Sequence, residues 1–119
     1  MMFCLVKKVG VRLGDRRRDP GFIGETDDWY AESLRERSQV QTFESEAAAK
    51  FARDTVEAMD WQIIQSLAAD VRDRTGDDPV DDTRFALVEF IGRHHETATK
   101  ILEEVPGDGP EEDEGGGSE

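Results

Sequence analysis

The histidines are the first residues to consider for catalysis or metal binding. His94 and His95 are the only two in the chain, and they are adjacent. Adjacent side chains on a helix diverge by about 100°, so both imidazoles cannot aim at one metal or one substrate without strain. The sequence contains no second group of His or Cys residues that would complete a zinc site. We therefore expect core or interface histidines, no metal and no cofactor.

Aspartates in the C-terminal half raise the question of a calcium site, because hard cations are bound by several carboxylate oxygens. They are Asp73, Asp77, Asp78, Asp81 and Asp82. If Gly76 were the sixth residue of a calcium loop, the first would be Val71, which cannot act as a ligand. Helix capping and a solvated acidic surface account for these aspartates better than a metal ion does.

Motifs of the common enzyme classes are absent from the sequence. It has no Gly-x-x-x-x-Gly-Lys phosphate loop, no Gly-x-Gly-x-x-Gly fingerprint, no Gly-x-Ser-x-Gly elbow and no Cys-x-x-Cys pair. The single cysteine, Cys4, lies in an apolar run, which predicts a buried, inert thiol and a reducing, cytoplasmic compartment. We expect a non-enzymatic protein.

Three consecutive arginines, Arg16–Arg18, contrast with a formal net charge of −13 for the chain. Residues 1–42 carry a net +1, residues 43–105 carry −8 and residues 106–119 carry −6. Asp15 and Asp19 bracket the arginines and are expected to cancel much of their field. Because Asp19-Pro20-Gly21 is typical of a turn, we interpret the stretch first as a charged hairpin connection.

The same stretch has an alternative interpretation as a nucleic-acid site. Basic side chains can bind phosphates while neighbouring aromatic rings stack on bases. The candidate contacts are Arg16, Arg17, Arg18, Trp29 and Tyr30, aided by Lys7, Lys8 and Arg12. Binding of this kind is recognised by its dependence on salt concentration.

Composition predicts a soluble, single-domain protein. Its 119 residues fit one domain, and no run approaches the ~18 apolar residues of a membrane helix. The six apolar residues at the start are followed at once by two lysines, unlike a signal peptide. Acids exceed bases by 28 to 15 and Arg exceeds Lys by eleven to four. This composition resembles that of salt-in halophiles, although high-GC bacteria also favour Arg.

Strand patterns occupy the first part of the chain. Apolar residues alternate between Phe3 and Leu13, which predicts one strand or two short strands broken near Lys7 and Lys8. Phe22 and Ile23 could begin a return strand, and residues 29–35 could form one or two helical turns. Residues 38–43 indicate a strand rich in polar residues, and therefore an edge strand. We expect an antiparallel sheet of two or three strands within residues 2–43.

Helical patterns follow from Ser45, which is a favourable N-cap. The apolar stripe of the first helix moves by roughly 110° beyond Trp61, so we favour a break between helices near 45–59 and 62–74. One continuous helix and a short strand over residues 61–64 are the alternatives. Asp78-Pro79 then predicts the start of a last helix over about residues 79–104. The fold class is therefore α+β.

The last helix has the widest apolar face of the chain, about 160° against the ~100° expected of a helix that lies on one core. Its polar face carries Glu89 before Arg93 and Glu96 before Lys100, each pair four residues apart. This width predicts two partners for the helix, one within the chain and one outside it. The second could be another copy of the protein.

A protein–protein interaction or regulatory module is the function that these patterns favour. The candidate contacts are Trp61, Phe90, His94 and Ile101. The partner would be a second copy or another protein, with nucleic acid less favoured and no membrane contact expected.

The last fourteen residues, 106–119, contain five Gly, two Pro and six acids, which predicts a disordered, solubilising tail after a domain at 1–105. A further alternative is that the acids imitate nucleic-acid phosphates. In that case the protein would be a mobile-element-encoded inhibitor of a nucleic-acid-binding enzyme.

Overall fold

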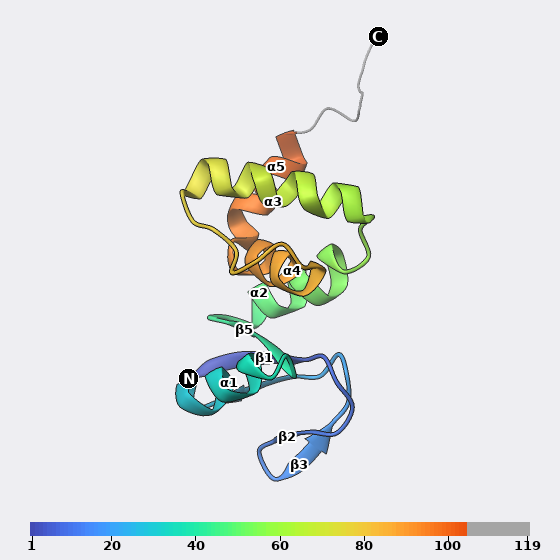
Figure 1. Cartoon of the computed structure of the whole chain (residues 1–119), viewed down its shortest axis with the longest axis vertical. Coiled ribbons are helices and arrows are strands. Elements are labelled where there is room, and N and C mark those ends of the chain that lie inside the picture. Colours follow the sequence, from blue (N-terminus) through green and yellow to red (C-terminus); the bar gives the residue numbers. More distant parts are fainter. Residues whose placement is uncertain (105–119) are drawn as a thin grey trace.

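The computed structural model describes residues 1–104, and the expected tail at 106–119 lies outside them. Its architecture is α+β, as predicted, with a small antiparallel sheet, a separate two-stranded hairpin and five α-helices among the described residues (Figure 1). The elements are β1 (Met2–Val6), β2 (Val11–Leu13), β3 (Arg16–Arg18), β4 (Ile23–Thr26), α1 (Asp28–Glu36), β5 (Val40–Phe43), α2 (Glu46–Phe51), η1 (Ala52–Val56), α3 (Trp61–Thr75), α4 (Arg84–Arg93) and α5 (His95–Glu104).

The central sheet has the strand order β4-β1-β5, and both pairings are antiparallel. Of the two alternatives for the first apolar run, two short strands with a break near Lys7 and Lys8 is the one observed, because β1 ends at Val6 and β2 begins at Val11. The return strand after Phe22 is confirmed as β4, and the edge position of β5 is confirmed by the strand order. All four residues of β5 are nevertheless buried, so its polar side chains do not face solvent.

The arginine stretch belongs to a hairpin, as predicted, but Arg16–Arg18 form its second strand and not its connection. The hairpin turn is Gly14-Asp15, and Gly14 has a φ of +71°. A two-residue turn with a left-handed glycine in its first position has the twist that a hairpin needs. Arg16–Arg18 therefore become β3, paired along β2.

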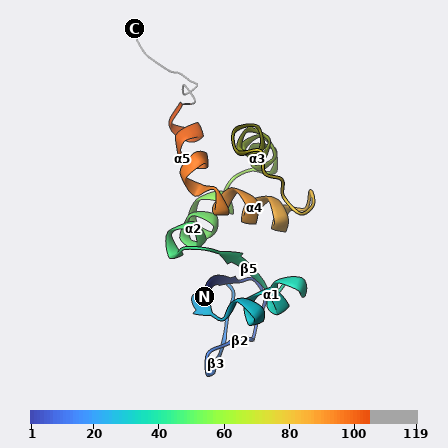
Figure 2. The same cartoon turned by 90° about the vertical axis from the view of Figure 1, so that its left-hand side faces the viewer.

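Both faces of the sheet are covered (Figures 1 and 2). Helix α1 and the β2–β3 hairpin cover one face, where Cys4 and Val6 of β1 join a small core with Ala31 and Leu34. Helices α2 to α5 build the second and larger core on Leu5 and Phe43. Alternate residues of β1 thus enter different cores, as the period of a strand requires.

The predicted break before α3 is confirmed. Ser45 Oγ accepts a hydrogen bond from Ala48 N at 3.1 Å and caps α2, which continues into the π-helical segment η1. Helix α3 then begins at Trp61, so the strand alternative for residues 61–64 is wrong. Gly76, with a φ of +79°, ends α3 in the left-handed conformation that favours glycine.

The last helix is shorter than predicted and is bent. It begins at Arg84, with Thr83 as its cap, because Thr83 Oγ1 accepts from Ala86 N at 3.2 Å; Asp78 and Pro79 lie in the preceding loop. His94 leaves the helical conformation, with φ −108° and ψ 42°, and separates α4 from α5. The bend returns Ala98 and Ile101 of α5 to the same core as α4.

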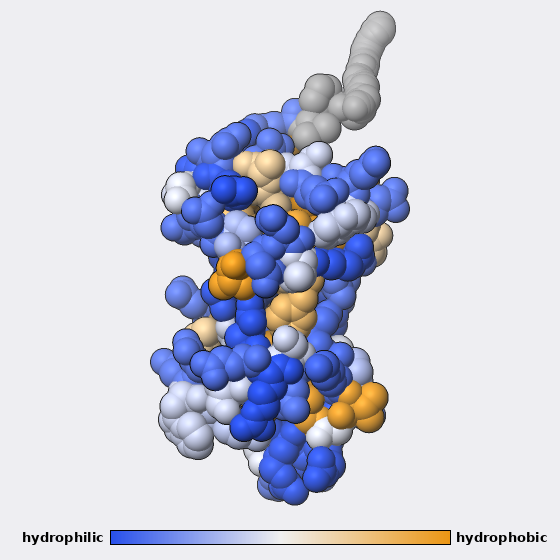
Figure 3. Space-filling view, in the orientation of Figure 1, coloured by the Kyte–Doolittle hydropathy of each residue, from blue (hydrophilic) through white to orange (hydrophobic). Residues whose placement is uncertain are grey.

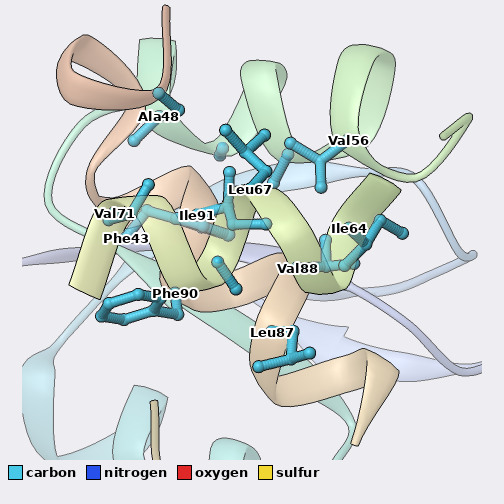
Figure 4. Packing of buried hydrophobic residues seen from close by; sticks show 14 of the residues in the cluster. Phe43, Ala48, Val56, Ile64, Leu67, Val71, Leu87, Val88, Phe90 and Ile91 are labelled. Atoms are coloured by element: carbon cyan, nitrogen blue, oxygen red, sulfur yellow. The ribbon is translucent and has the colours of Figure 1, made fainter. Parts of the chain in front are cut away.

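The wide apolar face is explained within the chain. Residues Ala86–Gly92 of α4 are all buried, because α4 lies between β5, α2 and η1 on one side and α3 on the other. Figure 4 shows Val88, Phe90 and Ile91 of α4 among side chains from these elements.

Among the described residues, no helix has both the length and the apolar character to span a bilayer.

Candidate functional site

The β2–β3 hairpin, residues 11–18, concentrates exposed positive charge, and we call it the arginine hairpin. Its register pairs Arg12 with Arg17 and Leu13 with Arg16. Directly opposed side chains lie on the same face of a strand pair. Since Val11 and Leu13 are buried against the sheet, Arg12 and Arg17 share the outward face. Like charges in this arrangement repel one another.

Contacts hold two of the four hairpin arginines in place without neutralising them. Arg17 Nη1 donates to the carbonyl oxygen of Gly10 at 3.0 Å. The guanidinium of Arg18 lies 4.2 Å from the centroid of the Phe22 ring, as a cation–π pair. None of these partners carries a negative charge, so the positive charge stays available to a ligand.

Arginines outside the hairpin are in a different situation. Six of those seven form ion pairs with carboxylates: Arg35, Arg53, Arg72, Arg74, Arg84 and Arg93. Within residues 1–104, none of the four hairpin arginines has such a pair. The expected neutralisation by Asp15 and Asp19 is therefore not made by direct ion pairs. From Lys7 to Arg18 the chain carries six bases and one acid.

The structure brings Trp29, Tyr30 and the arginine hairpin into one region, whereas Lys7, which was also expected to aid binding, forms an ion pair with Glu57 at 2.7 Å. Helix α1, which carries Trp29 and Tyr30, covers the same face of the sheet as the arginine hairpin. Tyr30 donates its hydroxyl proton to the carbonyl oxygen of Arg12 at 2.9 Å. Trp29 lies edge-on to Tyr30 with ring centroids 5.6 Å apart. In Figure 3 the lower end of the molecule, which contains the hairpin and α1, has a mostly hydrophilic surface.

The predicted protein-contact residues are not brought together on a surface. Phe90 and Ile101 are 5% and 4% exposed and belong to the core of the chain itself. His94 is half-buried, and its ring packs edge-on to Phe90 at 5.0 Å. Trp61, at the start of α3, is 37% exposed. Only Trp61 of the four therefore presents a substantial surface.

A polar cleft of about 730 Å³ lies beside the bend at His94. His94 Nε2 is 3.2 Å from Asp77 Oδ2, and Arg93, Glu44 and Ser45 also line the cleft. The hydroxyl of Ser45 already serves as the cap of α2. In the part of the chain that the structure describes, no group of three or more His, Cys, Asp or Glu side chains could hold a metal ion.

A buried ionic network is the polar feature that the sequence patterns missed. Glu89 was expected on the exposed face of its helix, but its side chain is 4% exposed. Its carboxylate accepts from Arg35 Nε at 2.8 and 2.9 Å and from the backbone N–H of Thr42 at 2.9 Å. Arg93 Nε donates to the carbonyl oxygen of Thr42 at 2.9 Å.

The network has a structural role at the edge of the sheet. An edge strand leaves backbone N–H and C=O groups without partners, and burial makes that costly. Glu89 and Arg93, one turn apart on α4, occupy both groups of Thr42 in β5. The signal available in the sequence was the Glu89–Arg93 spacing; nothing local indicated Arg35, which is 54 residues from Glu89.

The single thiol is buried, as predicted. Burial raises the pKa of Cys4 to about 11, so the reactive thiolate is disfavoured.

Comparisons of the chain with known protein families, with curated proteins and with solved structures find no match. Of the features described, the arginine hairpin alone combines exposure with charge that lacks a partner within residues 1–104.

Proposed function

We propose that the protein binds nucleic acid and that the arginine hairpin contacts the phosphate backbone. The observation that carries the proposal is the clustering of four arginines without ion pairs, counted over residues 1–104, in a chain of net charge −13. Elsewhere in residues 1–104, six of the seven arginines form ion pairs with carboxylates, Arg37 being the exception. A guanidinium binds a phosphate through two parallel hydrogen bonds, which makes arginine suited to this contact.

A repeating anion fits the hairpin better than a single anion does. Arg12 and Arg17 are directly opposed and repel one another, and Arg16 lies one residue away. A polymer with a phosphate at every nucleotide supplies anions to several guanidiniums at once and relieves this repulsion. A two-stranded ribbon is also an element that nucleic-acid-binding proteins use to approach their ligand.

Fluorescence anisotropy with labelled single- and double-stranded oligonucleotides tests the proposal. The variant Arg12→Ser/Arg16→Ser/Arg17→Ser removes three exposed charges, and we expect its affinity to fall at least about tenfold. The slope of log affinity against log salt concentration should become shallower by about two to three, because each lost phosphate contact contributes ~0.7–0.9.

A matched control separates local contact from net charge. Arg37→Ser/Lys50→Ser/Lys100→Ser removes the same charge from exposed sites outside the hairpin. We expect this variant to retain most of the affinity. If both triple variants weaken binding equally, or if the unmodified protein binds no oligonucleotide even at the lowest salt at which it stays folded, the proposal is wrong.

Self-association through the C-terminal helices stays a prediction, as does inhibition of a nucleic-acid-binding enzyme by acidic mimicry. Exposed Trp61 and Ile63 at the start of α3, with Leu102 of α5, are the apolar side chains that favour the first. Light scattering coupled to size-exclusion chromatography tests it, since a strict monomer at every concentration would exclude a dimer. A pull-down from native lysate tests the second.

A further inference from the structure

We infer that the arginine hairpin and Trp29 form one site for single-stranded nucleic acid, with a base stacked on Trp29 and the neighbouring phosphates on the arginines. This inference rests on the proposed function and adds the form of the ligand. Its first observation is the exposure of Trp29, whose surface is 72% accessible against 37% for Trp61. An exposed indole ring that is linked to a basic ribbon through Tyr30 offers a stacking surface for a base.

The indole is attached to the hairpin through a short chain of contacts. Its ring packs edge-to-face on Tyr30, with centroids 5.6 Å apart and an interplanar angle of 63°. The hydroxyl of Tyr30 is hydrogen-bonded to the backbone of Arg12, and Tyr30 packs against the smaller core. Trp29 and the outward pair Arg12 and Arg17 therefore have a defined separation. Such preorganisation lowers the entropic cost of binding.

Stacking on Trp29 requires a base whose face is accessible. In a duplex the base faces are covered by the neighbouring base pairs, whereas a single strand can present them to an aromatic side chain. The phosphates of the same strand can turn toward the hairpin at the same time. Both parts of the site are then used by one strand.

Acidic side chains near Trp29 oppose a second strand. Asp27 precedes helix α1, Glu32 follows Trp29 by three residues on the same helix face, and both are exposed. A duplex would bring the phosphates of its other strand toward these carboxylates, and like charges brought together in an interface disfavour the complex. The same carboxylates would thus select against duplex while the hairpin attracts phosphate.

The experiment uses the full chain with Trp61→Phe, which leaves Trp29 as the only tryptophan. The protein is titrated with a labelled single strand, with the duplex of the same sequence, and with a strand of the same length that lacks bases, while Trp29 fluorescence is recorded. The anisotropy of the label gives the affinity. We expect quenching by the single strand alone. We also expect Trp29→Ala to weaken single-strand binding roughly 5- to 150-fold, and Trp29→Phe to retain most of it.

The outcomes separate this inference from the proposed function. If duplex and single strand bind equally and Trp29→Ala changes neither affinity, the inference is overturned while phosphate binding by the hairpin stands. If Trp29→Ala weakens binding but the hairpin triple variant does not, the proposed function fails and so does the joint site. Quenching by the single strand, weaker duplex binding and loss in both variants together support it.

Discussion

Glu89 shows how far the environment of one side chain can depart from its position on a helical wheel. The wheel places it opposite the apolar face, yet it is buried between Arg35 and Arg93 and bonded to the backbone of β5. Its burial is tolerated because its carboxylate oxygens accept hydrogen bonds from positive groups and from a backbone N–H. The residue therefore connects α1, β5 and α4.

Replacing Glu89 should be strongly destabilising. Glu89→Ala leaves Arg35 without its carboxylate and leaves the Thr42 N–H unbonded, and we expect a loss of about 3–5 kcal/mol in the free energy of unfolding. Urea denaturation followed by circular dichroism measures it. Glu96→Ala, at an exposed position on α5, should change stability by less than about 0.5 kcal/mol. A loss below about 1 kcal/mol for Glu89→Ala would contradict the role assigned to the network.

Cys4 makes stability depend on alkaline pH. Because burial raises the pKa of its thiol to about 11, the folded state keeps a proton that the unfolded chain, with an ordinary thiol pKa near 9.0, has already released. The stabilisation is complete below pH 9 and is lost as pH rises toward 11. We expect the stability difference between the unmodified protein and Cys4→Ala to shrink across this range, measured by urea denaturation at each pH. A difference independent of pH would count against a protonated, buried thiol.

Helix α4 is the element on which the larger core is built, and Gly92 is its closest contact. A Cβ atom at this position would lie 2.6 Å from Phe43 Cε1 and 2.8 Å from the Cβ of Ala52. Glycine therefore allows α4 to approach both β5 and η1. Its poor helix propensity is the cost of that approach.

Gly92→Ala should destabilise the protein although alanine is the better helix former. Alanine favours the helix by about 1 kcal/mol, but overpacking a core costs typically 1–3 kcal/mol, and the two contacts here are below normal separation. We expect a lower thermal midpoint for Gly92→Ala. Ser66→Ala introduces the same side chain at an exposed position of α3 and should leave the midpoint unchanged or slightly higher. An increase for Gly92→Ala would show that the helix can shift.

Element boundaries that follow from local periodicity were predicted well. Boundaries that depend on contacts between distant residues were not. The alternation of β1 and β2 and the shift of the stripe at Trp61 are local patterns, and both correspond to observed boundaries. The bend at His94 has no glycine or proline to signal it at that residue. It follows from packing, because α5 turns back onto α3 and the shared core.

Charge is divided along the molecule as a whole. The arginine hairpin lies at one end of the long axis and the end of α5 at the other, with the acidic helical layer between the sheet and that end (Figure 1). An approaching polyanion is attracted only locally, and the net charge of −13 repels it at longer range. Added salt should weaken both the long-range repulsion and the local attraction. Weaker repulsion raises the affinity for a polyanion, whereas weaker local contacts lower it.

Neutralising the acids of residues 106–119 tests this division. Replacing all six by amides changes the formal net charge from −13 to −7 without touching the described fold. We expect tighter oligonucleotide binding at low salt, because repulsion is screened only beyond a Debye length of about 10 Å at 0.1 M. The gain should vanish near 1 M salt, where that length is about 3 Å. Equal affinities at low salt would show that long-range repulsion does not limit binding.

Local patterns in the sequence were sufficient for the α+β class, the antiparallel sheet, the capped start of α2, the break before α3 and the burial of Cys4, because each depends on periodicity or on neighbours along the chain. The candidate residues of the arginine hairpin were also identifiable by type. Only the tertiary structure shows that these arginines lack ion pairs within residues 1–104, that Tyr30 links Trp29 to the backbone of Arg12, and that Glu89 forms an ion pair with Arg35. Those relations depend on which distant residues become neighbours in space, and that follows from packing a sheet between two layers.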